Sequence, residues 1–155
     1  MKVEVVATLA VAPAYIWHAM VTPLQMSRWL CKEAVFEARV GKPYRILLAK
    51  PEGATKDEVL SGRVAAWVPE VRLSLSVTGA KHLTTETVVT LFLASLGEGK
   101  TRLTIVHDGF KKMANKDRPE AMAAVETFWK NAVIRLAALL NTTIVEGEPT
   151  TVAHV

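Results

Sequence analysis

DRPEAMAAVETFWKNAVIRLAALL, residues 117–140, is the stretch that decides the fold. At about 100° per residue, its apolar side chains gather on one face and its polar side chains on the opposite face, the pattern of an amphipathic helix. The apolar face comprises Met122, Val125, Trp129, Ala132, Val133, Leu136 and Leu140, with Phe128 and Leu139 on its flank. The polar face comprises Glu120, Thr127, Asn131 and Arg135. Such a helix spans about 35 Å, so its apolar face needs a broad partner surface rather than one neighbouring helix.

The start of this helix carries recognisable signals. Asp117 can cap the first turn, and Glu120, three residues later, completes a pair that resembles a capping box. Pro119 is tolerated there because the first N–H groups of a helix have no intrahelical partner. We therefore expect the helix to begin at Asp117.

The N-terminal part of the chain predicts a strand followed by two short helices. Apolar and other residues alternate over Lys2–Val11, which is typical of a strand with one buried face. Pro13 marks the first turn of a helix that ends near Val21, where Thr22 and Pro23 form a corner. Leu24–Leu30 has near-helical apolar spacing and predicts the second helix.

Between Glu33 and Phe110 no helical period is present, and extended segments alternate with turn residues. These segments are AVFEARV, YRILLA, EVLSGRVAAWV, VRLSLSV, TTETVVTLFLASL and TRLTIVHDGF. Their short connections favour antiparallel hairpins, and Gly62 is interpreted as a bulge. With the first strand, the sequence predicts a seven-stranded antiparallel sheet.

A curved sheet opposite one long helix defines an α+β fold with a space between the two layers. Seven antiparallel strands twist and curl, so a helix on the concave side cannot close against all of them. Alternation turns toward that space Tyr44, Ile46, Leu48, Leu73, Leu75, Val77, Thr87, Val89, Leu91, Leu93, Leu103, Ile105 and His107. We expect the space to be mostly apolar.

Length and composition exclude several classes of protein. The chain of 155 residues fits a single domain, predicted over residues 1–141, with a C-terminal tail over 142–155 that is either disordered or a late strand. Cys31 is the only cysteine, which suits a reducing, cytoplasmic setting and excludes a Cys-rich metal site. The net charge of +4 is mild. The basic cluster formed by Lys111, Lys112, Lys116 and Arg118 has no aromatic residues between its charges, so nucleic-acid binding is not expected. No segment is long enough to span a membrane.

Several stretches resemble one known family over about Val3–Leu140. They are APAYIWHAMVTPLQMSRWL, FEARVGKPYRI, GRVAAWVPEVRLSLS, TETVVTLFLASLGEGKTRLTIVHDGF and the helix that contains Trp129. In order and spacing they resemble the START-like, or SRPBCC, superfamily, and within it the branch named after the activator of the heat-shock-chaperone ATPase. This resemblance implies the helix-grip fold, in which the sheet wraps around the long C-terminal helix. One departure is at Gly41, which is followed by Lys42 where the family often has a second glycine.

The resemblance implies an apolar cavity that different members use for lipid or hormone binding, for polyketide cyclisation or for chaperone contact. In this chain the candidate ligand-binding residues are the inward-facing positions of the strands, the apolar face of the helix and the aromatic residues near the ends of the cavity. They are Tyr44, Leu75, Leu91, Ile105, His107, Phe110, Met122, Val125, Trp129 and Val133. No cofactor is predicted.

His107 is the candidate with the most chemistry, because alternation places it on the cavity face. It could act as an acid, a base or a ligand anchor, or it could satisfy a buried backbone group. Its neighbour Asp108 should point to the opposite face, so the two do not form a catalytic pair. Serine motifs and metal-ligand spacings are missing, so we assign no catalytic residue and no metal site. Cys31 is interpreted as a small buried apolar residue.

The leading hypothesis is a soluble domain that binds a small hydrophobic molecule between helix and sheet. One alternative is an enzyme resembling polyketide cyclases or dehydratases that uses the same cavity, and another is a module that contacts a chaperone. Lys111, Lys112 or Arg118 could meet an acidic ligand head or partner, or belong to a solvated loop. Val88 and Phe92 lie on the outer face and, if exposed together, favour a homodimer or another partner surface over a free monomer.

Overall fold

A computed structural model describes residues 1–49, 57–145 and 151–154, the last of these as backbone only. Its described residues form one eight-stranded sheet with the order β2-β3-β4-β5-β6-β7-β1-β8, in which every neighbouring pair is antiparallel. The strands are β1 (Lys2–Leu9), β2 (Glu33–Val35), β3 (Pro43–Leu48), β4 (Glu58–Val68), β5 (Arg72–Val77), β6 (Thr87–Gly97), β7 (Lys100–Asp108) and β8 (Thr151–His154). The helices are α1 (Pro13–Val21), α2 (Pro23–Trp29) and α3 (Arg118–Leu139), and a 3-10 turn, η1 (Phe110–Lys112), precedes α3.

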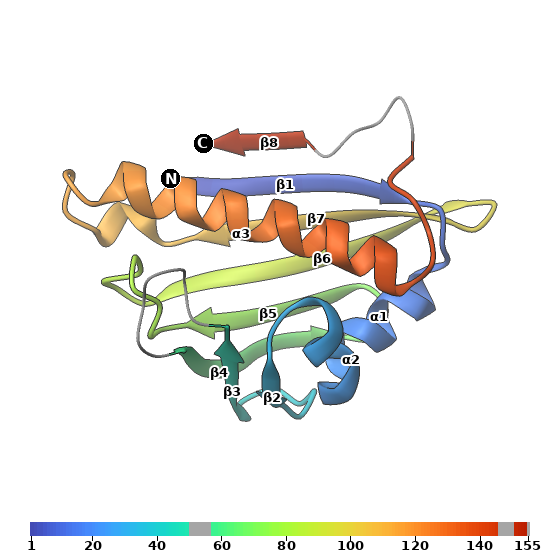
Figure 1. Cartoon of the computed structure of the whole chain (residues 1–155), viewed down its shortest axis with the longest axis horizontal. Helices are drawn as coiled ribbons and strands as arrows, with labels where there is room; N and C mark the ends of the chain where they lie inside the picture. Colours follow the sequence, from blue (N-terminus) through green and yellow to red (C-terminus); the bar gives the residue numbers. More distant parts are fainter. Residues whose placement is uncertain (50–56, 146–150, 155) are drawn as a thin grey trace.

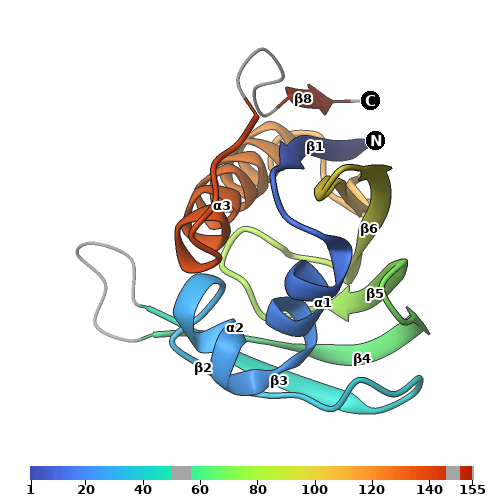
Figure 2. The same cartoon turned by 90° about the vertical axis from the view of Figure 1, so that its right-hand side faces the viewer.

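The sheet curls around the helices. In Figure 1, α3 runs alongside β1, and β6, β5 and β4 follow progressively further from it. Figure 2 shows the sheet turning through a wide arc, from β1 beside α3 to β3 and β2 beside α2, with α1 inside the arc. The predicted α+β helix-grip fold, with seven antiparallel strands, two short helices after the first strand and one long C-terminal helix, is therefore confirmed.

The edges of the sheet differ from the predicted ones. The segment AVFEARV forms only the short strand β2, which ends at Val35. An eighth strand, β8, comes from the predicted tail and pairs with β1, so that Val3 lies opposite His154. Just before it, the backbone N–H of Val145 donates to the Thr8 carbonyl at 2.8 Å. The described tail residues thus extend the sheet, while the division at residue 141 stays a prediction.

The start of α3 lies where it was predicted, but its cap does not. Asp117 is the N-cap residue, yet its backbone is helical, with φ −93° and ψ −23°, and its side chain makes no capping hydrogen bond. A capping side chain accepts a hydrogen bond from the backbone N–H of N2 or N3 and starts from an extended backbone, which Asp117 does not have. Its N–H instead continues a turn by donating to the Ala114 carbonyl at 3.0 Å. The capping-box prediction for Asp117 and Glu120 is therefore wrong.

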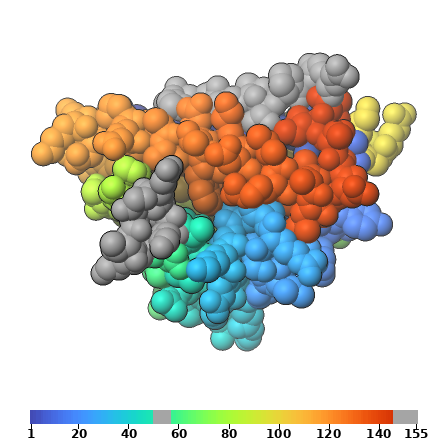
Figure 3. All heavy atoms as spheres, viewed as in Figure 1, coloured from blue at the N-terminus to red at the C-terminus, as the bar shows by residue number. Residues whose placement is uncertain are grey.

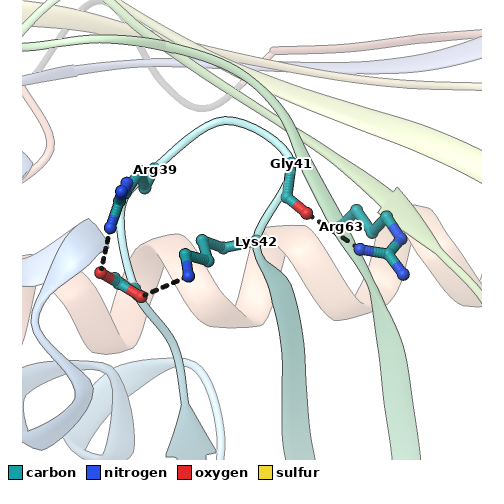
Figure 4. Close-up of polar contacts among 5 residues, drawn as sticks. Arg39, Gly41, Lys42 and Arg63 are labelled. Atoms are coloured by element: carbon teal, nitrogen blue, oxygen red, sulfur yellow. Dashed lines mark hydrogen bonds and ion pairs between the residues drawn. The ribbon is translucent and has the colours of Figure 1, made fainter.

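The turn between β2 and β3 needs only one glycine. Gly41 has φ +84°, a conformation that favours glycine, and its carbonyl accepts a hydrogen bond from Arg63 at 2.9 Å (Figure 4). Lys42 takes the place of the family's second glycine without a positive φ and lies 3.8 Å from the Glu37 carboxylate. Arg39 pairs with the same carboxylate at 3.4 Å. The departure from the family pattern therefore leaves the hairpin intact.

The bulge in β4 is displaced from Gly62. Gly62 pairs in regular register with Tyr44, and the register shifts between Val64 and Ala66. A Cβ atom at Gly62 would collide with the backbone oxygen of Ser76 on β5. The glycine is thus explained by the close approach of a neighbouring strand, and the prediction of a bulge at Gly62 is wrong.

Candidate functional site

A cavity of about 170 Å³ lies between α3 and the curved sheet. Side chains from α2, β3, β4, β5, β6, β7 and α3, and from the β5–β6 loop, form its walls. The lining residues are Met26, Leu30, Tyr44, Ile46, Leu48, Glu58, Leu60, Leu75, Val77, Ala80, His82, Leu83, Val89, His107, Ala124, Val125, Phe128 and Trp129. The walls are almost entirely apolar, which suits an apolar guest.

The structure divides the predicted ligand-binding residues into two groups. Those that line the cavity are Tyr44, Leu75, His107, Val125 and Trp129. Those that are buried elsewhere in the core are Leu91, Ile105, Phe110, Met122 and Val133. Whether the first group touches a ligand stays a prediction.

The second group is buried for reasons that the sequence pattern could not distinguish. Val133 belongs to the part of α3 that packs tightly, and it has no exposed surface. Phe110, also fully buried, lies behind His107, with its ring centre 5.5 Å from the imidazole. An inward-facing position therefore favours burial, but only the tertiary arrangement decides which inward side chains border the cavity.

Some cavity-lining residues are not among the predicted ligand-binding residues, although the sequence carries a signal for them. Ile46, Leu48, Val77 and Val89 alternate with outward residues on their strands and were expected to face inward. Ala80, His82 and Leu83, by contrast, lie in the loop between β5 and β6, where no period exists. Their approach to α3 is a consequence of the fold alone.

His107 is held between two side chains at the cavity wall. Its Nε2 lies 2.7 Å from the Thr87 hydroxyl, and its Nδ1 lies 3.2 Å from the indole nitrogen of Trp129. An indole N–H can only donate, so Nδ1 must accept and the ring proton sits on Nε2, which donates to Thr87. Both ring nitrogens are therefore engaged in the neutral form. The sequence left open that His107 bonds a buried backbone group. Its ring instead bonds the side chains of Thr87 and Trp129.

The charge state of His107 follows from its burial. Only 3% of the residue is exposed. Loss of hydration lowers its pKa to about 4, and the negative charge of the nearby Asp108 opposes that shift. Asp108 itself is exposed, as predicted, and accepts a hydrogen bond from the Gly109 N–H at 2.7 Å. His107 is neutral at pH 7.

Tyr44 and Cys31 both keep their protons at pH 7. Burial raises the pKa of Tyr44 well above its usual value, and its hydroxyl donates to the Ser76 carbonyl. Burial also raises the pKa of Cys31 to about 11, so the thiol stays protonated at pH 7. Its sulfur lies 3.6 Å from the Met26 carbonyl. These groups offer shape and hydrogen bonds rather than nucleophiles.

The loop between β5 and β6 closes one end of the cavity against α3. His82 lines the cavity and its Nδ1 lies 3.7 Å from the Glu120 carboxylate at the start of α3. Arg118 donates to the carbonyls of Phe110, Lys111 and Met113 at 2.8–3.1 Å, so it ties η1 to α3. Because these carbonyls occupy its guanidinium, Arg118 is not a free anchor for an acidic head.

A second hollow, of about 530 Å³, lies next to the cavity and is more polar. We call it the basic groove. It is lined by Ser27, Arg28, Trp29, Leu30, Cys31, Lys32, Leu48, Ala49, Glu58, Phe128 and Arg135. Leu30, Leu48, Glu58 and Phe128 line both spaces, so they form the wall between the cavity and the groove. Figure 3 shows the face on which α2, in blue, lies directly below the C-terminal half of α3.

The described residues contain neither a metal-binding cluster nor a membrane-spanning helix. Histidine, cysteine, aspartate and glutamate side chains within these ranges form no group of three or more that could hold a metal ion. No helix in the described part of the chain is both long and apolar enough to cross a membrane.

Comparison with known proteins places the chain in a family. The family model for activator of Hsp90 ATPase homolog 1-like proteins matches residues 10–141. The chain belongs to this family. It is therefore a member of the activator-like branch of the SRPBCC superfamily, as the sequence motifs indicated. No curated protein sequence matches the chain.

Solved structures share the fold over nearly the whole chain. The protein MLL2253 from Mesorhizobium loti is 24% identical over 91% of this chain and 97% of its own, with a TM-score of 0.74. A protein from Rhodobacter sphaeroides is 28% identical over 90% of this chain and 91% of its own, with a TM-score of 0.73. DynU16, a protein in the dynemicin biosynthetic locus, is 20% identical over 96% of this chain and 48% of its own, with a TM-score of 0.72.

Proposed function

We propose that this member of the activator-like family binds a small apolar molecule in the cavity between α3 and the sheet. The observation that carries the proposal is the cavity itself, whose walls are almost entirely apolar. Native cores are packed to the density of organic crystals, so an unfilled space costs contacts on all of its walls. A guest that fills it recovers those contacts, which gives apolar ligands a reason to bind.

The volume limits the size of the guest. An engineered cavity of about 150 Å³ in another protein holds benzene. The cavity here, at about 170 Å³, therefore suits a single ring or a short alkyl chain. A long lipid or a folded polyketide would have to displace walls or extend beyond the cavity.

His107 supports binding better than catalysis. A general base needs a free lone pair, whereas Nδ1 of His107 already accepts the Trp129 N–H at 3.2 Å. With a pKa of about 4, the ring also lacks the proton that a general acid needs at pH 7. The geometry favours His107 as part of a fixed polar wall, and a cyclase or dehydratase function rests on fold analogy alone. Chaperone contact and a homodimer stay predictions.

A matched pair of variants on α3 tests the proposal. Ala124 lines the cavity, and its neighbour Ala123 is exposed on the same helix. Ala124→Leu should fill the cavity and weaken binding of 4-phenylbutan-1-ol about tenfold or more, because a leucine side chain takes the volume of the ring. Ala123→Leu should leave the dissociation constant unchanged. Isothermal titration calorimetry measures both, and equal affinity in the two variants would rule out the cavity as the binding site.

A further inference from the structure

The basic groove carries positive charge that the rest of the described structure does not neutralise. Arg28, Lys32 and Arg135 line it, and Glu58 is the acidic residue among its lining. Lys32 is paired with Asp57 at 3.1 Å. Arg28 and Arg135 have no ion pair with any acidic side chain in the described ranges. Two guanidinium groups are therefore available at the groove.

Structural roles use little of these two side chains. The Nε of Arg135 donates to the Trp29 carbonyl at 2.8 Å, which leaves its terminal N–H groups for other acceptors. Arg28 is exposed at the last turn of α2. The carboxylate of Glu58 accepts a hydrogen bond from the backbone N–H of Lys81 at 2.9 Å, so it is bonded to the loop between β5 and β6. A guanidinium is the side chain best shaped to hold a carboxylate.

The cavity and the groove share part of their lining, so a molecule that extends past this shared lining can contact both. Phe128 is half-buried and belongs to both linings, and its ring meets Trp129 edge to face at 5.0 Å. Leu30 and Leu48 complete the apolar wall at this place. A short alkyl arm can lie against the apolar side chains of Leu30, Leu48 and Phe128 in this wall.

The physical chemistry assigns each part of such a ligand to one space. An ionised carboxylate cannot enter the apolar cavity, because burial without partners costs several kcal/mol or more. A ring or alkyl group gains little in a groove that is open and polar, and more in the cavity. From this arrangement we propose that the ligand is an amphiphilic organic acid, with its apolar body in the cavity and its carboxylate at Arg28 and Arg135 in the basic groove.

This inference rests on the proposed function, and the experiment separates the two. Two probes share one apolar body: 4-phenylbutyrate has a carboxylate at the end of the arm and 4-phenylbutan-1-ol has a hydroxyl. Calorimetric titration of the unmodified protein at pH 7 should give a dissociation constant about tenfold lower for the acid, because a charge-assisted hydrogen bond is stronger than a neutral one. Raising the salt concentration should weaken only the acid.

Variants locate the carboxylate. Arg28→Gln should reduce the preference for the acid to about threefold, and the double variant Arg28→Gln/Arg135→Gln should abolish it, while affinity for the alcohol stays unchanged. Arg102, exposed on β7 outside both linings, gives the matched control, and Arg102→Gln should leave the preference intact. A purely structural role of Arg135 would lower the affinity of both probes together.

Other outcomes overturn the inference in distinct ways. Equal affinity for acid and alcohol in the unmodified protein would refute the amphiphilic acid but leave the apolar cavity as a binding site. A preference that survives the double variant would place the carboxylate elsewhere and refute the role of the basic groove. Binding of neither probe would refute the proposed function as well.

Discussion

The two ends of α3 have different surroundings, although both present an apolar face to the sheet. Ala132, Val133 and Leu136, toward the C-terminus, are 0% exposed and do not line the cavity, whereas Val125 and Trp129, which come earlier in the helix, do line it. The difference arises because α2 packs against the C-terminal half, where Arg135 donates to the Trp29 carbonyl at 2.8 Å, and lies directly below that half in Figure 3. One amphipathic pattern therefore builds a packed core at one end and the wall of a cavity at the other.

The largest expected effect comes from the same substitution, leucine to alanine, made once in the packed part of α3 and once in the cavity wall. Leu136→Ala, in the packed half, should cost about 4 kcal/mol of unfolding free energy, because it removes contacts on every side and leaves a new void. Leu75→Ala, at the cavity wall, should cost about 2 kcal/mol, because one side of Leu75 already faces empty space. Urea denaturation measures both losses, and the dependence of unfolding free energy on urea concentration should have the same slope in the two variants. Equal losses would contradict the distinction between packed core and cavity wall.

The next effect concerns pH and the buried His107, at the polar end of the cavity wall. Its pKa is about 4 in the folded protein and 6.5 in a model peptide. Between these values the unfolded chain binds a proton that the folded chain does not, so stability rises with pH across this window. The total gain should be on the order of 3 kcal/mol, fully present above pH 6.5 and lost as the pH falls toward 4.

Denaturation midpoints at pH 4.5 and 7 measure this effect. His107→Gln should remove most of the dependence, because glutamine does not titrate. His82→Gln is the matched control, since His82 is only half-buried at the cavity mouth. A pH dependence that persists unchanged in His107→Gln would show that other groups cause it.

A smaller effect tests the hydrogen bond between α3 and β7. Trp129→Phe keeps an aromatic ring but removes the N–H that Nδ1 of His107 accepts. An unsatisfied buried acceptor costs about 1–3 kcal/mol, and part of the lost ring volume adds to it. The same variant should raise the pKa of His107, because the Trp129 N–H stabilises only the neutral ring. NMR titration of His107 distinguishes this from simple loss of packing, which would leave its pKa unchanged.

The smallest effect sharpens the comparison from the opposite direction. Ala124→Leu should stabilise the protein by about 1 kcal/mol, because the added side chain fills space in the N-terminal half. Ala123→Leu should change stability by about 0.5 kcal/mol or less, as an exposed helical site does. Thermal unfolding of the two variants measures the difference. A destabilised Ala124→Leu variant would mean that this half is already fully packed.

Sequence reasoning succeeded where the periodicity was long. The helix over residues 118–139 and the strands β1 to β7 follow from apolar spacing, and the motifs around them indicated the family. It failed at short-range details. Asp117 occupies the N-cap position without capping, and Gly62 marks a close strand approach rather than a bulge. These details depend on how neighbouring backbones meet, which periodicity does not encode.

The candidate site was predicted only as far as alternation allowed. Tyr44, Leu75, His107, Val125 and Trp129 line the cavity, while Leu91 and Ile105, which have the same inward orientation, are packed against other side chains. The loop residue His82 and the adjacent basic groove had no signal in the sequence. Residues from separate elements meet there only after folding.

By itself, the sequence determined that one face of each strand and one face of α3 would be buried, because removal of apolar side chains from water follows from their spacing. The tertiary structure alone decided where burial leaves a void. The curl of the sheet, which depends on all the strands together, and the place of α2 beneath α3 decide which part of the space between the layers is filled. Hence Leu136 became core and Trp129 became a cavity wall, although both belong to the same predicted face.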